Sequence, residues 1–312
     1  SAEGIASYPV PTGRQCVAHS RYAGTEHTAR GGQRVLTHAV LIARQDFARL
    51  GSNPMRVWSA VPPLIEPGPD ERFPPSLPAL NLKPDPHQVL AGGGLVGMAP
   101  ETLCGLCSQL MAGQRLVVRG AKRPFAALEW TLMLLPVSIR AKVSVSVGIR
   151  VSPSRPVSLA WVEPDTGETD RAIIGQAIEL IDLQQSGASF EPSPPEWFSL
   201  LQRWWNERRW DEICLLTNRL MGRVNTVDLV RIAAIAQAID DAAVADAPRL
   251  QQYKSMGQRI KPGSDVERDL LEQLGQVISA RFRALERQGF APKGQPDASP
   301  AVPPRTAKVG AG

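Results

Sequence analysis

The chain has 312 residues, of which 43% are hydrophobic and 21% are charged, and it carries a net charge of +5. This balance excludes a wholly disordered chain and predicts two domains, each with a buried core. The longest apolar stretches fall well short of the roughly 20 residues that cross a bilayer, so a membrane-spanning class is excluded as well. The excess of basic residues permits contact with nucleic acid without requiring it.

The cysteines indicate the cellular compartment, and the first residue bears on whether the first domain is complete. Four cysteines are too few and too scattered to cross-link a chain of this length, so we expect a reducing, cytoplasmic environment. The chain begins at Ser1 and shows no secretory signal pattern. We therefore expect a start within a longer reading frame, with a first domain that is incomplete at its N-terminus.

The N-terminal half alternates strand-like runs with turns. Residues 33–43 are rich in Val, Leu and Ile and follow the turn pair Gly31-Gly32, which predicts a strand that continues into a short helix over 44–50. The many prolines between residues 62 and 86 exclude a helix or a central strand there. That segment is predicted to be a long surface loop.

A helix is predicted to begin at Pro100 and to end before Gly113, with apolar residues at helical spacing between them. Residues 176–183 fit either a strand or the end of a helix. The order of strands and helices predicts an α+β fold with a mixed sheet over residues 1–184. The remaining expected elements of this half are strands over 115–119, 142–151 and 157–162 and a buried helix over 124–135.

The character of the sequence changes after residue 195. Residues 184–195 have the Gly, Ser and Pro content of a linker. Apolar residues three and four apart then predict an all-α domain of about four helices over 195–290. Residues 291–312 lack core-forming side chains, so we expect a disordered tail. The expected helices cover 196–210, 212–221, 226–243 and 265–288.

Cysteine and histidine spacing supports one catalytic or metal hypothesis. Cys104 and Cys107 form a CxxC pair, and Cys16 with His19 forms a CxxH pair, which together could supply four ligands to zinc or the thiols of a hydrolase. Cys16 and His38 could also form a nucleophile and base pair. The competing interpretation is that the CxxC thiols lie on an apolar helix face and are buried core residues.

Aromatic and basic residues alternate near the start of the helical region. Trp204, Trp205, Arg208 and Arg209 could stack on bases and neutralise phosphates, as in a nucleic-acid-binding protein. The tryptophans also share a stripe with leucines at helical spacing, which indicates a core-facing helix. We favour packing, and keep a partner surface as the alternative.

Two stretches together resemble a known family. The run from His19 to Ile42, HSRYAGTEHTARGGQRVLTHAVLI, resembles the N-terminal domain of the GTPase-associated protein family, which carries an Arg, a Thr-x-Arg and a His-Ala step into a strand. Residues 128–147, with a Leu-Pro, an Arg and a serine-containing strand, are similar to the middle domain of that family. The matching positions are Arg21, Thr28, Arg30, His38, Pro136 and Arg140.

The resemblance implies a bacterial adaptor that is encoded beside small GTPases and acts in signalling or conflict systems. It implies no catalytic residue set and no cofactor, so the matching positions are expected to form a partner-binding or structural signature. Arg30 and Arg140 equally fit buried guanidinium groups that hold loops through bonds to carbonyls. The expected function is non-enzymatic docking of a small GTPase or related protein through the loops of the α+β half, with the helical half as a scaffold or second docking surface. The alternatives are the metal- or thiol-dependent hydrolase and the nucleic-acid-binding protein.

Overall fold

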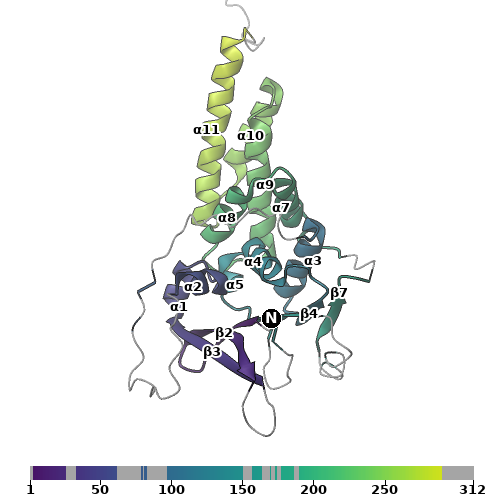
Figure 1. The fold of residues 1–312 in the computed structure, drawn as a ribbon. Coiled ribbons are helices and arrows are strands. Elements are labelled where there is room, and N and C mark those ends of the chain that lie inside the picture. The colour runs from purple at the N-terminus through teal and green to yellow at the C-terminus, as the bar shows by residue number, and fades with distance from the viewer. Residues whose placement is uncertain are drawn as a thin grey trace, which may run out of the picture. The chain divides into compact units, whose positions relative to one another are not determined.

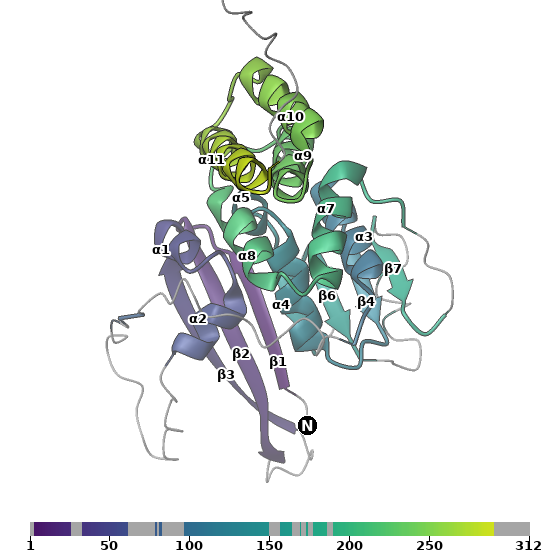
Figure 2. The same cartoon turned by 90° about the horizontal axis from the view of Figure 1, so that it is seen from above.

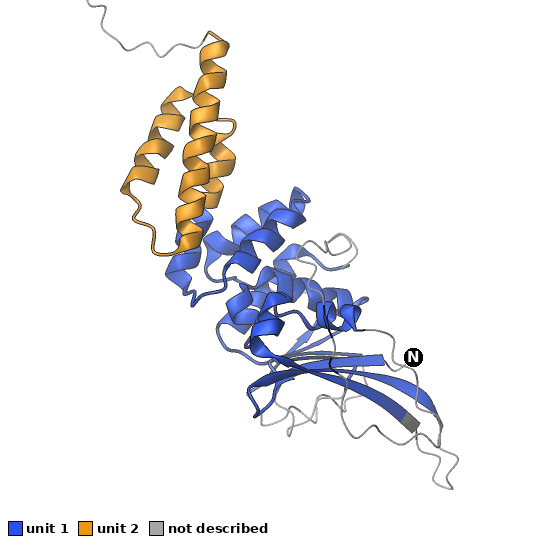
Figure 3. Ribbon diagram, turned by 90° about the vertical axis from the view of Figure 1, so that its left-hand side faces the viewer, with its two compact units in different colours: residues 1–234 blue, residues 235–312 orange. Residues whose placement is uncertain are grey.

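The computed structural model describes residues 3–25, 33–61, 79, 81–82, 97–149, 157–163, 169, 173, 177–185 and 190–289. The chain divides into two compact units, Ser1–Ala234 and Ile235–Gly312 (Figure 3). The predicted loop over 62–86, apart from three positions, and the predicted tail over 291–312 lie outside the described residues. The mixed sheet of the N-terminal half, followed by helices, confirms the predicted fold class.

Within the described residues, the strands form one seven-stranded sheet in the order β3-β2-β1-β5-β6-β4-β7 (Figure 2). Strands β3, β2, β1 and β5 pair antiparallel, whereas β5, β6, β4 and β7 pair parallel. The three long strands, β1, β2 and β3, all lie in the antiparallel half. The strands are β1 (Glu3–Pro9), β2 (Arg14–Thr25), β3 (Gln33–Ala43), β4 (Leu116–Arg119), β5 (Val145–Val147), β6 (Leu159–Val162) and β7 (Glu179–Asp182).

The predicted strands β3, β4 and β6 are present, and the ambiguous segment 176–183 contains strand β7. No strand was predicted for the segment around His19, where the structure has strand β2. This strand has few branched apolar residues, but β1 pairs with it on one side and β3 on the other. Pairing on both edges overrides weak local strand propensity.

Helices cover one side of the sheet (Figure 1). Helices α1 and α2 contact β2, α3 contacts β4, and α4 contacts β5 and β6. Helix α4 is apolar on nearly all sides, which suits a helix between the sheet and other helices. The helices of this unit are α1 (Arg44–Arg49), α2 (Pro54–Ala60), α3 (Pro100–Met111), α4 (Pro124–Leu134), α5 (Val137–Arg140), α7 (Pro195–Asn206) and α8 (Trp210–Arg219).

The first unit extends past the expected linker at 184–195. Helix α7 packs against α3, and α8 packs against α4, α5 and α7. These two helices therefore belong to the core of the α+β unit, and the unit boundary falls within α9 (Thr226–Ala242). Periodicity located the helices correctly, but it carries no information about which core they join.

The second unit contains the end of α9 together with α10 (Ala247–Arg259) and α11 (Asp265–Arg287). Helices α10 and α11 pack together, and Arg281 Nε donates to the Ala245 carbonyl at 3.0 Å. Helix α10 was not predicted, although Asp246 caps it and Pro248 stands in its first turn, which is a usual helix start. Across the described ranges, no helix combines the length and apolar character that crossing a membrane requires.

A buried guanidinium ties three parts of the first unit together. Arg140, at the end of α5, is buried and reaches the α1–α2 turn, the end of α4 and helix α8. Its hydrogen bonds run from Nε to Leu135 O (2.7 Å), from Nη1 to Gly51 O (2.9 Å) and Asn218 Oδ1 (2.7 Å), and from Nη2 to Met133 O (3.1 Å) and Thr217 Oγ1 (2.7 Å).

The planar fork of Arg140 accounts for the geometry of this junction. All five oxygen acceptors belong to carbonyl, amide or hydroxyl groups, so the charge is solvated by dipoles. Thr217 Oγ1 accepts from Arg140 and donates in turn to the Ile213 carbonyl at 2.9 Å, which orients the hydroxyl. Burial lowers the pKa of the guanidinium, because the charged form loses its hydration.

We expect Arg140→Lys to lower the free energy of unfolding by about 3 kcal/mol, because an ammonium group lacks the fork and leaves buried acceptors unpaired. Denaturant unfolding measures the change. The matched control is Arg49→Lys, whose guanidinium is exposed and pairs with Asp46 at 3.1 Å. This control is expected to stay within about 0.5 kcal/mol of wild type. Equal effects of the two substitutions would contradict the assigned role of Arg140.

Candidate functional site

His19 and His38 lie opposite each other on β2 and β3, on the side of the sheet that the helices cover. Trp58 of α2 packs on both rings, with centroid distances of 4.4 Å to His19 and 6.3 Å to His38. Glu3 of β1 places its Oε1 atom 2.5 Å from His19 Nε2. The carboxylate therefore orients one imidazole, while the indole covers its ring.

Three strands are linked to α2 by the group of side chains that consists of Glu3, His19, His38 and Trp58. The resemblance nominated His38 and also Arg21, which lies opposite Glu3 on β1 and Leu36 on β3. Nothing in the local sequence indicates Glu3 or Trp58, because both reach the group only through strand register and helix packing. The nominated Thr28 and Arg30 lie outside the described residues.

The other two nominated positions, Pro136 and Arg140, belong to the corner between α4 and α5. Pro136 precedes α5, and its carbonyl accepts from the Arg140 amide at 3.0 Å. The Arg140 side chain is enclosed by the hydrogen bonds described above. These residues therefore shape the core, as the second interpretation of Arg140 predicted.

The predicted four-ligand zinc or thiol site is not assembled. Cys16 and His19 are three residues apart on β2, and successive side chains of a strand alternate between its faces, so these two point to opposite sides of the sheet. The same alternation separates Cys16 from His38, which excludes that nucleophile and base pair. Among the described residues, no group of three or more His, Cys, Asp or Glu side chains could hold a metal ion.

The CxxC thiols are core residues of α3. Cys104 and Cys107 are buried, and Cys107 Sγ donates to the Thr131 carbonyl at 3.2 Å. Burial raises the pKa of Cys104 to about 12 and raises that of Cys107 well above its usual value. Both thiols therefore stay protonated and unreactive at neutral pH.

The proposed base-stacking tryptophans are buried as well. Trp205 meets Trp130 of α4 edge to face, with centroids 4.8 Å apart. The Arg209 guanidinium lies 4.8 Å from the Trp204 ring centre and covers that ring. Arg208 is exposed and adopts a left-handed backbone conformation with φ of 58°. These rings therefore pack inside the first unit, as expected for a helix that faces the core.

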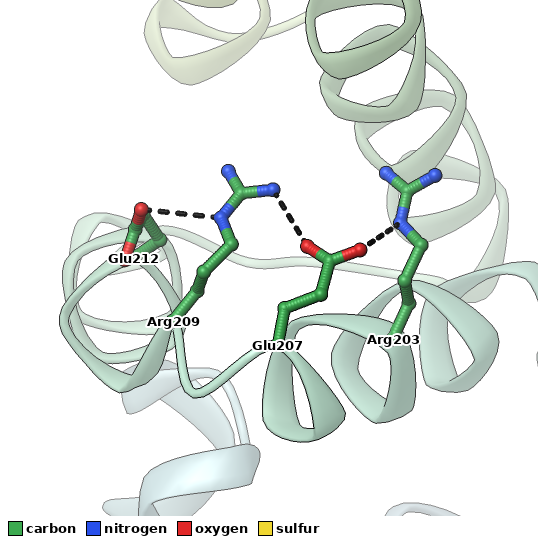
Figure 4. A network of polar contacts seen from close by, with 4 residues as sticks. All are labelled: Arg203, Glu207, Arg209 and Glu212. Atoms are coloured by element: carbon green, nitrogen blue, oxygen red, sulfur yellow. Dashed lines mark hydrogen bonds and ion pairs between the residues drawn. The ribbon is translucent and has the colours of Figure 1, made fainter.

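Carboxylates neutralise the arginines beside these rings (Figure 4). Glu207 lies between Arg203 (4.0 Å) and Arg209 (3.2 Å), and Arg209 also pairs with Glu212 at 3.2 Å. Arg209 therefore serves to close the turn between α7 and α8. Its charge is shared with two acidic groups and is poorly placed to hold a phosphate.

The side of the antiparallel strands that faces away from the helices carries exposed apolar side chains. We call this surface of β1, β2 and β3 the outer face. Tyr8 lies beside Cys16 and Leu41 in one cross-strand row, and Tyr22 lies beside Val35 in another. The exposed fractions are 40% for Tyr8, 44% for Tyr22, 60% for Val35 and 47% for Leu41.

The outer face concentrates half of the eight large apolar side chains that are exposed within the described residues. Two rows lie between these ends: alanines at positions 6, 18 and 39, and then Ser20 beside Thr37, whose hydroxyls are hydrogen-bonded at 2.9 Å. The larger apolar side chains therefore form two groups, one at each end of the surface. This surface was not predicted from the sequence. Alternation along β3 could have indicated it, because Val35, Thr37, Ala39 and Leu41 share one face.

A second group of ionisable residues lies between α2, α4 and α8. Glu129 of α4 is largely buried, and burial raises the pKa of its carboxyl from 4.5 to about 7 against the opposing effect of Arg56. Burial also raises the pKa of Cys214, which Arg140 and Arg56 counteract. Four ionisable side chains therefore lie together in this region: Arg56, Glu129, Arg140 and Cys214.

Comparison with known proteins adds no relative: no family model, no curated protein and no solved structure matches the chain.

The pKa of Glu129 predicts how stability depends on pH. The pKa of Glu129 is higher in the folded chain than in the unfolded chain, so the protonated carboxyl favours folding. This contribution to the free energy of unfolding is complete below pH 4.5 and is lost as pH rises through about 7. The loss amounts to about 3 kcal/mol at most. We expect Glu129→Gln to be near wild type in unfolding free energy at pH 5 and more stable than wild type at pH 8. A difference that is the same at both pH values would contradict the burial of this carboxyl.

Thiol labelling tests the assignment of the cysteines. In native protein we expect Ellman's reagent to react first with Cys214, which is the partly exposed thiol, and only slowly with the three buried ones. Cys214→Ser should remove the fast phase, while all remaining thiols should react in denaturant. Fast labelling of a CxxC thiol in the Cys214→Ser variant would revive the hypothesis of a thiol-dependent hydrolase.

Proposed function

We propose that the chain is a non-enzymatic adaptor that docks a protein partner on the outer face. The observation that supports this proposal is the gathering of Tyr8, Tyr22, Val35 and Leu41 on one side of three strands. Large apolar side chains exposed on one face of a folded protein commonly mark an interaction site, and tyrosine is favoured at such sites.

The polar groups of the first unit fit a scaffold better than a catalytic centre. Arg140 donates to carbonyls and side chains that belong to the fold itself, and Arg209 is paired with carboxylates. The Glu3 and His19 pair is covered by Trp58. These arrangements hold the strands and helices in place, and so they keep the outer face rigid for docking.

The class of partner follows from the family resemblance. We propose that the partner is a small GTPase or a related regulatory protein of a bacterial signalling or conflict system, and that docking occurs in the cytoplasm. Arg21 and His38, two of the matching positions, lie on the strands that form the docking surface, on its opposite, helix-facing side. In this proposal they keep the register and packing of those strands.

Affinity capture with matched variants tests the proposal. Tagged wild-type chain should enrich a small GTPase from a lysate of the source bacterium, as measured by quantitative mass spectrometry. The double variant Tyr8→Glu, Tyr22→Glu should retain at least about tenfold less, because it buries unpaired charge in the interface.

The control is the double variant Leu215→Glu, Val227→Glu, which alters apolar residues on α8 and α9 that are more exposed than the two tyrosines. It should capture as much GTPase as wild type. Circular dichroism establishes that all variants fold. Enrichment of no GTPase, or undiminished capture by the outer-face variant, would refute the proposal.

A further inference from the structure

Strand β3 forms one edge of the sheet within the described part of the chain. It is 11 residues long and pairs with β2 alone, so its other side presents a row of backbone amide and carbonyl groups. Unpaired edges of this kind bind further strands, and folded proteins usually protect them with charges, prolines, bulges or short length.

The opposite edge, β7, shows this protection. It has four residues and carries an acidic residue at each end, Glu179 and Asp182. Asp182 is also held by Arg119 of β4 at 2.8 Å. A foreign strand that approached β7 would meet charge and would find few backbone groups to pair with.

Strand β3 lacks these features. Its sequence is QRVLTHAVLIA, which contains no proline, no acidic residue and no lysine. Apart from His38, its one ionisable residue is Arg34, near the start of the strand. Its register with β2 runs without a shift from Val35 to Ala43. A long, regular and nearly uncharged edge is suited to adding another strand.

His38 is the central residue of β3, and the two exposed apolar residues, Val35 and Leu41, lie three residues from it on either side. An antiparallel pair of two β3 strands that is centred on His38 aligns all eleven residues, because 33 and 43 are equally distant from 38. In that register Val35 lies opposite Leu41 of the second strand, and Thr37 lies opposite Ala39. The two large apolar residues that β3 exposes would then cover each other.

We propose that two copies of the chain associate through antiparallel pairing of their β3 edges, centred on His38. The interface is isologous: each β3 offers the same backbone edge and the same side chains to the other. The partner is a second copy because the register that pairs the whole strand also brings Val35 against Leu41 and places no like charges opposite each other along the described side chains. The result is a continuous sheet that carries two outer faces.

Sedimentation equilibrium of the purified chain, without any partner, tests this inference. Wild type should form a dimer whose fraction rises with concentration. The variant Val35→Glu, Leu41→Glu places two acidic residues opposite each other at both ends of the pair, which should raise the dissociation constant at least about tenfold. The variant Val35→Lys, Leu41→Glu instead places a lysine opposite a glutamate, so it should dimerise at least about tenfold more tightly than the diglutamate variant.

These variants differ only in charge at the same two exposed positions, so they control for one another. If the diglutamate variant is unfolded by circular dichroism, Val35→Lys, Leu41→Lys takes its place with the same expected loss. A monomeric wild type overturns the inference and leaves β3 open to an extended peptide of another protein. A dimer that is indifferent to these charges also overturns it. Since no GTPase is present, neither outcome bears on the proposed docking at Tyr8 and Tyr22.

Discussion

The Arg140 guanidinium is the interaction on which the first unit depends. It lies where the α1–α2 turn, the α4–α5 corner and α8 meet, and it supplies donors to backbone and side-chain oxygens from all three. Without those donors, several carbonyls would be buried away from water at a cost of about 1–3 kcal/mol each. The position of α8, and with it the packing of Trp210 against Trp130, follows from this junction.

The two sides of the antiparallel strands have different roles. The helix-facing side holds the Glu3, His19, His38 and Trp58 group, where polar atoms and rings are used to join strands to α2. The outer face carries tyrosine, valine and leucine in the open. Since side chains alternate along a strand, the same residues of β2 and β3 can build both surfaces without conflict. In the proposed function, the outer face is the surface on which the partner docks.

Most of the longer helices were predictable because each carries its signal locally. Pro100 and Gly113 bracket α3, and apolar spacing located α7, α8, α9 and α11 within a few residues. Strand β2 was missed for the opposite reason: its residues form a strand only because β1 and β3 pair with both of its edges. The metal hypothesis failed on geometry, since CxxH in a strand places Cys16 and His19 on opposite faces.

The sequence by itself determined the fold class, the positions of most helices and the strand character of β3, because hydrophobic periodicity is a property of neighbouring residues. It also favoured buried roles for Cys104, Cys107, Trp204 and Trp205, through the apolar stripes they share. Only the tertiary structure decided the seven-strand order, the pairing of Glu3 with His19 and the outer face. Those features depend on register between segments that are far apart in the chain, and register is set by packing of the whole unit.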